Sequence, residues 1–302
     1  MTQITQPGIY DLPMEVYHSQ CCDGPSLSST EARILTNKTP AHLIAERLTI
    51  RESARNPDLG TVIHSLILEP FKSASAVEII KAPDFRSYAA HEHRDLAIKM
   101  GKTPILQKNY ELAQAAAERV LSHPVLSKVM KAGEAEKCFF AKDKATGIWV
   151  KARPDFISED GVVVDVKGVG EASDEFIQRR IFDGGWFQQA PWHAHVIERV
   201  NGLGIKDYLW AIIEMEPPHA VRVIRPAEAA LIHGARLNDK ALKIYAECCR
   251  KDFWPDYETD ISELGLADWA YYRLEAAAER ETSVNPMRAA QLARETGASP
   301  FA

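Results

Sequence analysis

The sequence has few cysteines and no CxxC pair. Its five cysteines form two adjacent pairs and one single residue, at positions Cys21, Cys22, Cys138, Cys248 and Cys249. An odd count without an export signal predicts reduced thiols, as in a cytoplasm. The missing CxxC motif argues against a zinc ribbon and an iron–sulfur cluster, although four of the five thiols could still meet in space.

Long apolar runs and an excess of basic residues are also missing. No run approaches the roughly 18 residues needed to cross a bilayer, and the opening stretch MTQITQPGIYDLP has no apolar signal-peptide core. We therefore expect a cytoplasmic protein with no membrane partner. The net charge is −6, from 36 Lys and Arg against 42 Asp and Glu residues. This balance argues mildly against nucleic acid as a partner, but an enzyme with a basic groove can be acidic overall.

The rest of the composition is that of a globular protein with a substantial core, since 46% of the 302 residues are hydrophobic and 26% charged. Hydroxyl caps, proline breaks and apolar periodicity predict helices near 26–35 and after Pro40, and over 59–68, 106–121, 174–182, 186–200 and 227–250. Alternating and β-branched runs predict strands over 136–142, 148–152, 154–158, 162–167, 208–215 and 220–224, the first two as a hairpin and the next two continuing its sheet. The polar stretch 81–103 predicts a loop or lid.

This order predicts an α/β fold with one mixed central sheet. We expect an N-terminal helical elaboration over residues 1–57, a core domain over 58–275 and a polar, loosely held C-terminal tail over 276–302.

Three charged side chains interrupt two apolar strands near the middle of the chain. Asp155 lies at the start of one strand, and Asp165 and Lys167 lie near the end of the next. Pairing of the two strands would bring the two carboxylates to one end of the sheet, where they repel each other unless a cation neutralises them. Oxygen ligands favour magnesium or manganese, and the carbonyl of Val166 could add another oxygen. Lys167 points to the same face as Asp165 and could orient a water or stabilise charge on a phosphate.

Two further residues are candidates for this metal site, each with a simpler alternative. Glu136 could reach a second metal ion, or it could be a solvated strand end. His64 lies on the helix predicted over 59–68, on one stripe with Gly60 and Leu68. It could be a ligand or a hydrogen-bonded core histidine.

The chain resembles the PD-(D/E)xK nuclease superfamily, and more closely the RecE-type exonucleases (exodeoxyribonuclease VIII) and their phage-encoded relatives. The matching segments occur in the family's order along residues 10–270: Met14–His18, Leu59–His64, Leu66–Pro70, Ala135-Glu136, Gly147, Arg153–Phe156, Val164–Lys167, Phe187–Ala190, Trp254–Tyr257 and Trp269-Ala270. The ordered set is far more specific than the pattern PD…DxK alone. It implies a restriction-endonuclease-like core.

The resemblance assigns roles to single residues. It implies that His64, Asp155 and Asp165, with the carbonyl of Val166, hold a metal ion, and that Lys167 is the catalytic lysine. It implies a glutamate ahead of the core at Glu136, and the glutamine of a Q-xxx-Y motif, which holds the DNA or the site, at Gln189.

Three positions depart from the family pattern. Gly168 stands where threonine usually follows the lysine, His193 replaces the tyrosine of the Q-xxx-Y motif, and Trp186 stands where a tyrosine is common. These departures bear on substrate detail more than on the chemistry. Several basic residues could contact phosphate or could be solvated: Lys142, Lys144, Lys151, Arg153, Arg179 and Arg180.

The activity implied by the resemblance is Mg²⁺-dependent hydrolysis of linear double-stranded DNA, with Mn²⁺ as a substitute ion. It further implies digestion from 5′ to 3′, a ring-shaped homo-oligomer on DNA ends, and a RecT-like annealing protein as a recombination partner. Two alternatives stay open at this point. One is a Cas4- or RecB-type nuclease of other polarity, and the other is a non-catalytic DNA-binding adaptor that kept the fold.

Overall fold

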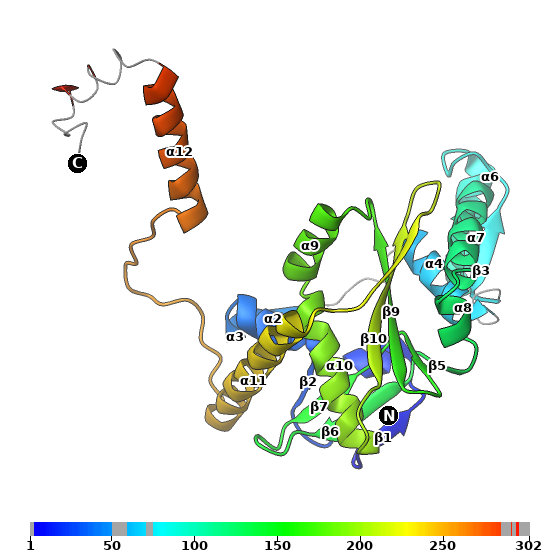
Figure 1. Ribbon diagram of the computed structural model, residues 1–302. Coiled ribbons are helices and arrows are strands. Elements are labelled where there is room, and N and C mark those ends of the chain that lie inside the picture. Colours follow the sequence, from blue (N-terminus) through cyan, green and yellow to red (C-terminus); the bar gives the residue numbers. More distant parts are fainter. Residues whose placement is uncertain (1–2, 50–58, 71–74, 285–290, 292–293, 296–302) are drawn as a thin grey trace. The chain divides into compact units, whose positions relative to one another are not determined.

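The computed structural model describes residues 3–49, 59–70, 75–284, 291 and 294–295 (Figure 1). Its contacts divide the chain into two units, Met1–Asp256 and Tyr257–Ala302. This division differs from the boundary expected after residue 275, which falls inside helix α12 (Asp268–Val284) of the second unit. The boundary expected after residue 57 lies outside the described residues. No helix in the described ranges has the length and apolar character that a membrane crossing requires.

A five-stranded mixed sheet forms the centre of the first unit. Its strand order is β11-β10-β9-β8-β5. Strands β9 and β10 are parallel, and the other neighbours are antiparallel. Their bounds are β5 (Gly133–Ala135), β8 (Phe156–Ser158), β9 (Val162–Val169), β10 (Asp207–Glu214) and β11 (Val221–Ile224). The predicted mixed sheet flanked by helices is confirmed.

A second sheet holds the predicted hairpin, with the order β1-β6-β7-β2. Its strands are β1 (Gly8–Tyr10), β2 (Ser26–Ser28), β6 (Cys138–Lys142) and β7 (Trp149–Ala152). The antiparallel pairing of β6 with β7 confirms the hairpin, but the prediction that β8 and β9 continue its sheet is wrong. Pro154 lies between β7 and β8, and proline has no N–H for a ladder, so the chain leaves one sheet there and enters the other.

Helices cover both faces of the central sheet (Figure 1). Val163 of β9 packs in a core with residues of α2, α10 and α11. Val164 and Val166, which point the other way, pack with residues of α4 and α7. The helices whose bounds fall within the described residues of this unit are α1 (Met14–His18), α2 (Ser29–Asn37), α3 (Pro40–Leu48), α4 (Leu59–Leu68), α6 (Tyr88–Lys99), α7 (Gln107–Leu121), α8 (Leu126–Val129), α9 (Asp174–Asp183), α10 (Trp186–Asn201) and α11 (Glu228–Lys251).

The prediction of a loop over residues 81–103 is wrong for most of that stretch, because Tyr88–Lys99 forms helix α6. Its start is capped by the Ser87 hydroxyl, which accepts a hydrogen bond from the Ala90 N–H at 3.3 Å. Only Ala90 and Ala97 of this helix are buried, so its sequence shows no stripe of large apolar residues. Two short parallel strands, β3 (Val77–Ile80) and β4 (Thr103–Leu106), flank α6 in sequence.

Candidate metal centre

Strand pairing brings Asp155 and Asp165 to the same end of the central sheet. Phe156 of β8 pairs with Val164 of β9 at the end of their ladder, and continuing this register beyond β8 would place Asp155 opposite Asp165. The N–H of Val166 donates a 2.6 Å hydrogen bond to Oδ2 of Asp155. This bond fixes the Asp155 carboxylate beside β9, as the sequence pattern predicted. The ligand role of the Val166 carbonyl stays a prediction.

His64 reaches the same point from α4. Its Nε2 lies 3.0 Å from Oδ2 of Asp155, and its Nδ1 lies 3.5 Å from Oε1 of Glu136. One ligand atom from each of these three side chains lies within 4.8 Å of the others, the only such group of three or more His, Cys, Asp or Glu residues in the described part of the chain. His64 therefore has ionic partners, unlike a histidine that only fills a core.

Glu136 occupies an unusual backbone position. The strand predicted over 136–142 begins only at Cys138, and Glu136 has a φ of +57°, a left-handed value rare for a residue with a side chain. Its N–H donates to the carbonyl of Asp155 at 3.0 Å. Its side chain is about nine-tenths buried, and its Oε2 accepts a 2.6 Å hydrogen bond from Nε of Arg153. Glu136 is therefore held at the site, and the solvated strand end considered from sequence is wrong.

Lys167, Asp165 and Gln189 form a connected ring beside His64, Glu136 and Asp155, the candidate metal-ligand group. Nζ of Lys167 lies 2.6 Å from Oδ2 of the fully buried Asp165 and donates to Oε1 of Gln189 at 3.0 Å. The Gln189 amide donates in turn to Oδ1 of Asp165 at 3.3 Å. Nζ also lies 5.7 Å from the centre of the Trp186 ring, within the range of a cation–π contact. The structure thus brings together every predicted site side chain, with Asp165 outside the three-residue group.

The electrostatics of the site are set by three acidic side chains and by His64, Arg153 and Lys167, which pair with them. Burial works against protonation of His64, but the carboxylates of Asp155 and Glu136 outweigh it and raise the pKa of His64 to about 9. Burial raises the pKa of Asp165 to about 6, with Lys167 acting in the opposite direction. Burial and the charge of Asp155 raise the pKa of Glu136. The imidazolium therefore offsets charge that a metal ion would neutralise more fully.

The donor set fits a divalent metal ion. It offers one imidazole nitrogen and several carboxylate oxygens, a mixture suited to the harder first-row ions and magnesium. The three carboxylates of Glu136, Asp155 and Asp165 face two permanent side-chain cations, Arg153 and Lys167. With His64 neutral, the site keeps an excess negative charge that a divalent cation would satisfy.

Two positions that depart from the family pattern have defined surroundings. His193 is buried, and burial lowers its pKa to about 4, so the ring is neutral near pH 7. Its Nδ1 lies 3.3 Å from the hydroxyl of Tyr208 in β10. The sequence predicted a strand at Tyr208 but no role for its side chain near the site. At Gly168, a methyl group would lie 2.7 Å from Sδ of Met215, so that side chain takes the space a larger residue would need.

Two basic residues considered for phosphate contacts are in fact buried or paired. Nζ of Lys151 donates to the carbonyls of Tyr17 and Ser19, both at 2.8 Å. Arg153 pairs with Glu136. Neither is a solvated residue, and Lys151 is not available to DNA. From the sequence, Lys151 and Arg153 could be recognised only as basic residues near Pro154-Asp155, and their partners could not be predicted.

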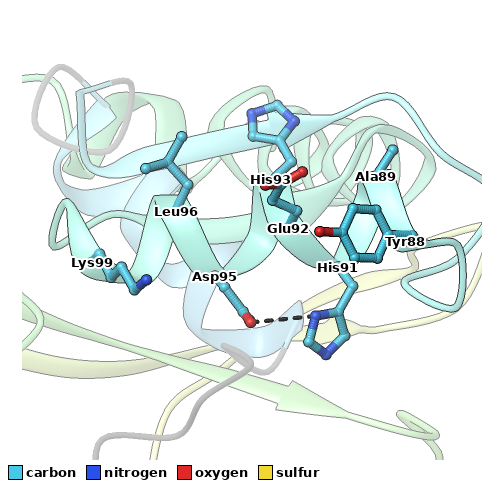
Figure 2. Close-up of a pocket in the computed structure, with 8 residues that line it drawn as sticks. All are labelled: Tyr88, Ala89, His91, Glu92, His93, Asp95, Leu96 and Lys99. Carbon is cyan, nitrogen blue, oxygen red and sulfur yellow. Dashed lines mark ion pairs between the residues drawn. The ribbon is translucent and has the colours of Figure 1, made fainter.

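A separate hollow of about 570 Å³ lies along α6 (Figure 2). The residues drawn around it all belong to this helix, and the ion pair drawn joins Nδ1 of His91 to Oδ2 of Asp95 at 3.3 Å. Its lining comes from a single helix, in contrast to the site around His64.

Comparison with known proteins places the chain in a family. A family model described as "PDDEXK-like domain of unknown function (DUF3799)" matches residues 28–263, which is most of the chain. A comparison with curated proteins found no match. A crystal structure from Eubacterium rectale, provisionally described as an exonuclease, is similar with a TM-score of 0.54 and 12% identity, covering 85% of this chain and 97% of that one.

A second solved structure is more distant. The alkaline exonuclease LHK-Exo from Laribacter hongkongensis has a TM-score of 0.27 and 10% identity, covering 55% of this chain and 86% of that one. Because the family model spans the central sheet and every residue of the site, the chain belongs to the PDDEXK-like family DUF3799 and has the PD-(D/E)xK nuclease-like fold.

Proposed function

We propose that the protein is a divalent-metal-dependent DNA exonuclease. The observation that carries this proposal is the convergence of His64, Glu136 and Asp155 within 4.8 Å, directly beside the paired Asp165 and Lys167. Nucleases of the PDDEXK type typically use divalent metals, and Mg²⁺ is our proposed ion, with Mn²⁺ as a substitute. An adaptor without activity would not need a lysine held between a carboxylate and an amide.

The residues divide into ion-binding and water-positioning groups. His64, Glu136 and Asp155 would hold the ion, with Asp165 and the Val166 carbonyl completing the set. Because Glu136 lies in the same group as His64, we propose that both serve one ion site. A bound divalent ion supplies Lewis-acid stabilisation of the charge that develops on the phosphate.

Lys167 is the residue proposed to act on the water. Its Nζ is held by Asp165 and Gln189, so its position is fixed before substrate binds. The water gives up a proton to solvent, its oxygen forms a new bond to phosphorus, the bond from phosphorus to the leaving sugar oxygen breaks, and that oxygen takes up a proton from solvent. The ammonium of Lys167 stabilises the attacking hydroxide and the negative charge near it.

The finer parts of the proposal concern the substrate and the partners. We propose linear double-stranded DNA as the substrate, digested from 5′ to 3′ by a ring-shaped oligomer in a cytoplasm, with a RecT-like annealing protein receiving the single strands. These finer parts of the proposal rest on the resemblance of the ordered motifs to the RecE-type exonucleases.

Purified protein, linear duplex DNA and closed circular plasmid test this function together. Linear DNA should be degraded in Mg²⁺ and spared in EDTA, and nick-free circles should survive. Asp165→Ala and Lys167→Ala should each abolish degradation while circular dichroism stays unchanged. Full activity in either variant would refute the assigned site, and rapid cutting of closed circles would show an endonuclease instead.

A further inference from the structure

Arg153 connects the metal-ligand group to the N-terminal segment. It lies between β7 and Pro154, with only 12% of its side chain exposed. Its Nε donates to Oε2 of Glu136 at 2.6 Å, and its Nη1 donates to the carbonyl of Leu12 at 3.2 Å. A guanidinium suits this task because its donors lie in one rigid plane and can serve two acceptors at once.

The contact with Arg153 decides which oxygen of Glu136 is available. Oε2 is taken by the guanidinium, and Oε1 is the oxygen that faces Nδ1 of His64 at 3.5 Å. The backbone of Glu136 is fixed as well, through its left-handed φ of +57° and its hydrogen bond to the carbonyl of Asp155. One oxygen of this carboxylate is thus turned into the group and the other is turned away.

We propose that Arg153 is a positioning residue for the metal site, because its guanidinium fixes Oε2 of Glu136 and thereby directs Oε1 toward the ion shared with His64 and Asp155. This inference rests on the proposed metal site. Partners that orient metal-ligating carboxylates and imidazoles typically contribute about 10- to 100-fold to metal affinity. Arg153 acts through Glu136 and contacts neither the ion nor the water.

Lys137 offers a matched control, because it is a neighbouring cation that does not contact the site. It lies next to Glu136 in sequence, but its Nζ pairs with Asp11 at 3.7 Å and with Glu134 at 3.6 Å. Lys137→Met removes one positive charge without touching the carboxylate of Glu136. It should leave Mn²⁺ affinity within about twofold of the original value, since only a screened surface charge is lost.

The test is titration of the full-length protein with Mn²⁺ in the absence of DNA, by calorimetry or by electron paramagnetic resonance of the free ion. Arg153→Met should weaken Mn²⁺ binding by about 10- to 100-fold. Arg153→Lys keeps the charge but has a single ammonium in place of the planar fork, so it should bind Mn²⁺ with intermediate affinity. Binding within twofold of the original protein in a folded Arg153→Lys variant would overturn the inference, even if Arg153→Met does not fold.

A double-mutant cycle separates positioning from a general effect on the fold. Glu136→Gln alone should weaken Mn²⁺ binding, and Arg153→Met should add little in the Glu136→Gln background because its target is gone. Multiplicative losses in the double variant would show that Arg153 acts by another route. If the original protein binds no Mn²⁺, the proposed function fails as well. If it binds Mn²⁺ and both Arg153 variants do so equally well, only this inference fails.

Discussion

Metal binding should compete with a proton on His64. The imidazole lies between two carboxylates, which raise its pKa to about 9 against the opposing effect of burial. A ligating imidazole must be neutral, so each bound ion has to displace this proton. A pH of about 7 lies two units below that pKa, so only about one molecule in a hundred carries a neutral His64 in the absence of metal.

The affinity for Mn²⁺ should therefore rise about tenfold for each pH unit between roughly pH 6.5 and 8.5, and level off above the pKa. Calorimetry in buffers of different ionisation enthalpy should report the release of close to one proton for each ion at about pH 7. His64→Gln should bind Mn²⁺ more weakly at the upper end of this range and lose the pH dependence. A flat affinity without proton release in the original protein would refute the reasoning.

The same proton affects the stability of the metal-free protein, with a defined sign. A base whose pKa is raised by folding stabilises the folded state fully below its unfolded pKa of about 6.5, and this stabilisation is lost as the pH rises through about 9. In EDTA, the melting temperature should fall over this window in the original protein. The fall should be smaller in His64→Gln, and an equal fall in both proteins would assign it to other groups.

Three further predictions concern other parts of the site and its support. Gln189→Ala should slow DNA degradation by about 10- to 100-fold while Mn²⁺ affinity changes little, because the amide orients Lys167 and does not hold the ion; a lost Mn²⁺ site would contradict this. Activity should fall as the pH drops through about 6, where Asp165 becomes protonated, and a rate unchanged down to about pH 5 would count against a charged Asp165. Gly234→Ala should lower the free energy of unfolding by about 1–3 kcal/mol or more, since its methyl group would lie 1.9 Å from the carbonyl oxygen of Phe187; an unchanged denaturant midpoint would disprove the close packing.

The sequence was sufficient for the parts of the site that depend on local pattern. The run of β-branched residues around Asp165 predicts a buried strand, and the period of two along that strand places Lys167 on the same face. The apolar periodicity of 59–68 predicts the helix that carries His64, which the structure shows at the same bounds. Each of these inferences needs only neighbouring residues.

The rest depends on contacts between distant segments. The sequence indicates that Pro154 interrupts a strand ladder. It does not indicate that the strands before and after Pro154 belong to different sheets. The left-handed backbone of Glu136 and its pairing with Arg153 follow from the way β5, β7 and β8 meet. Helix α6 escaped prediction because its buried residues are alanines, which give a weak periodic signal.

We propose that this site hydrolyses DNA from an end with a divalent ion held by His64, Glu136 and Asp155. The most direct measurement is a time course on linear duplex DNA, labelled separately at the 5′ and 3′ ends, in Mg²⁺ and in EDTA. The original protein should release the 5′ label as short products early and only in Mg²⁺, and Asp155→Asn should release none. Equal release from the original protein and Asp155→Asn, or no release from either end in Mg²⁺, would contradict the claim.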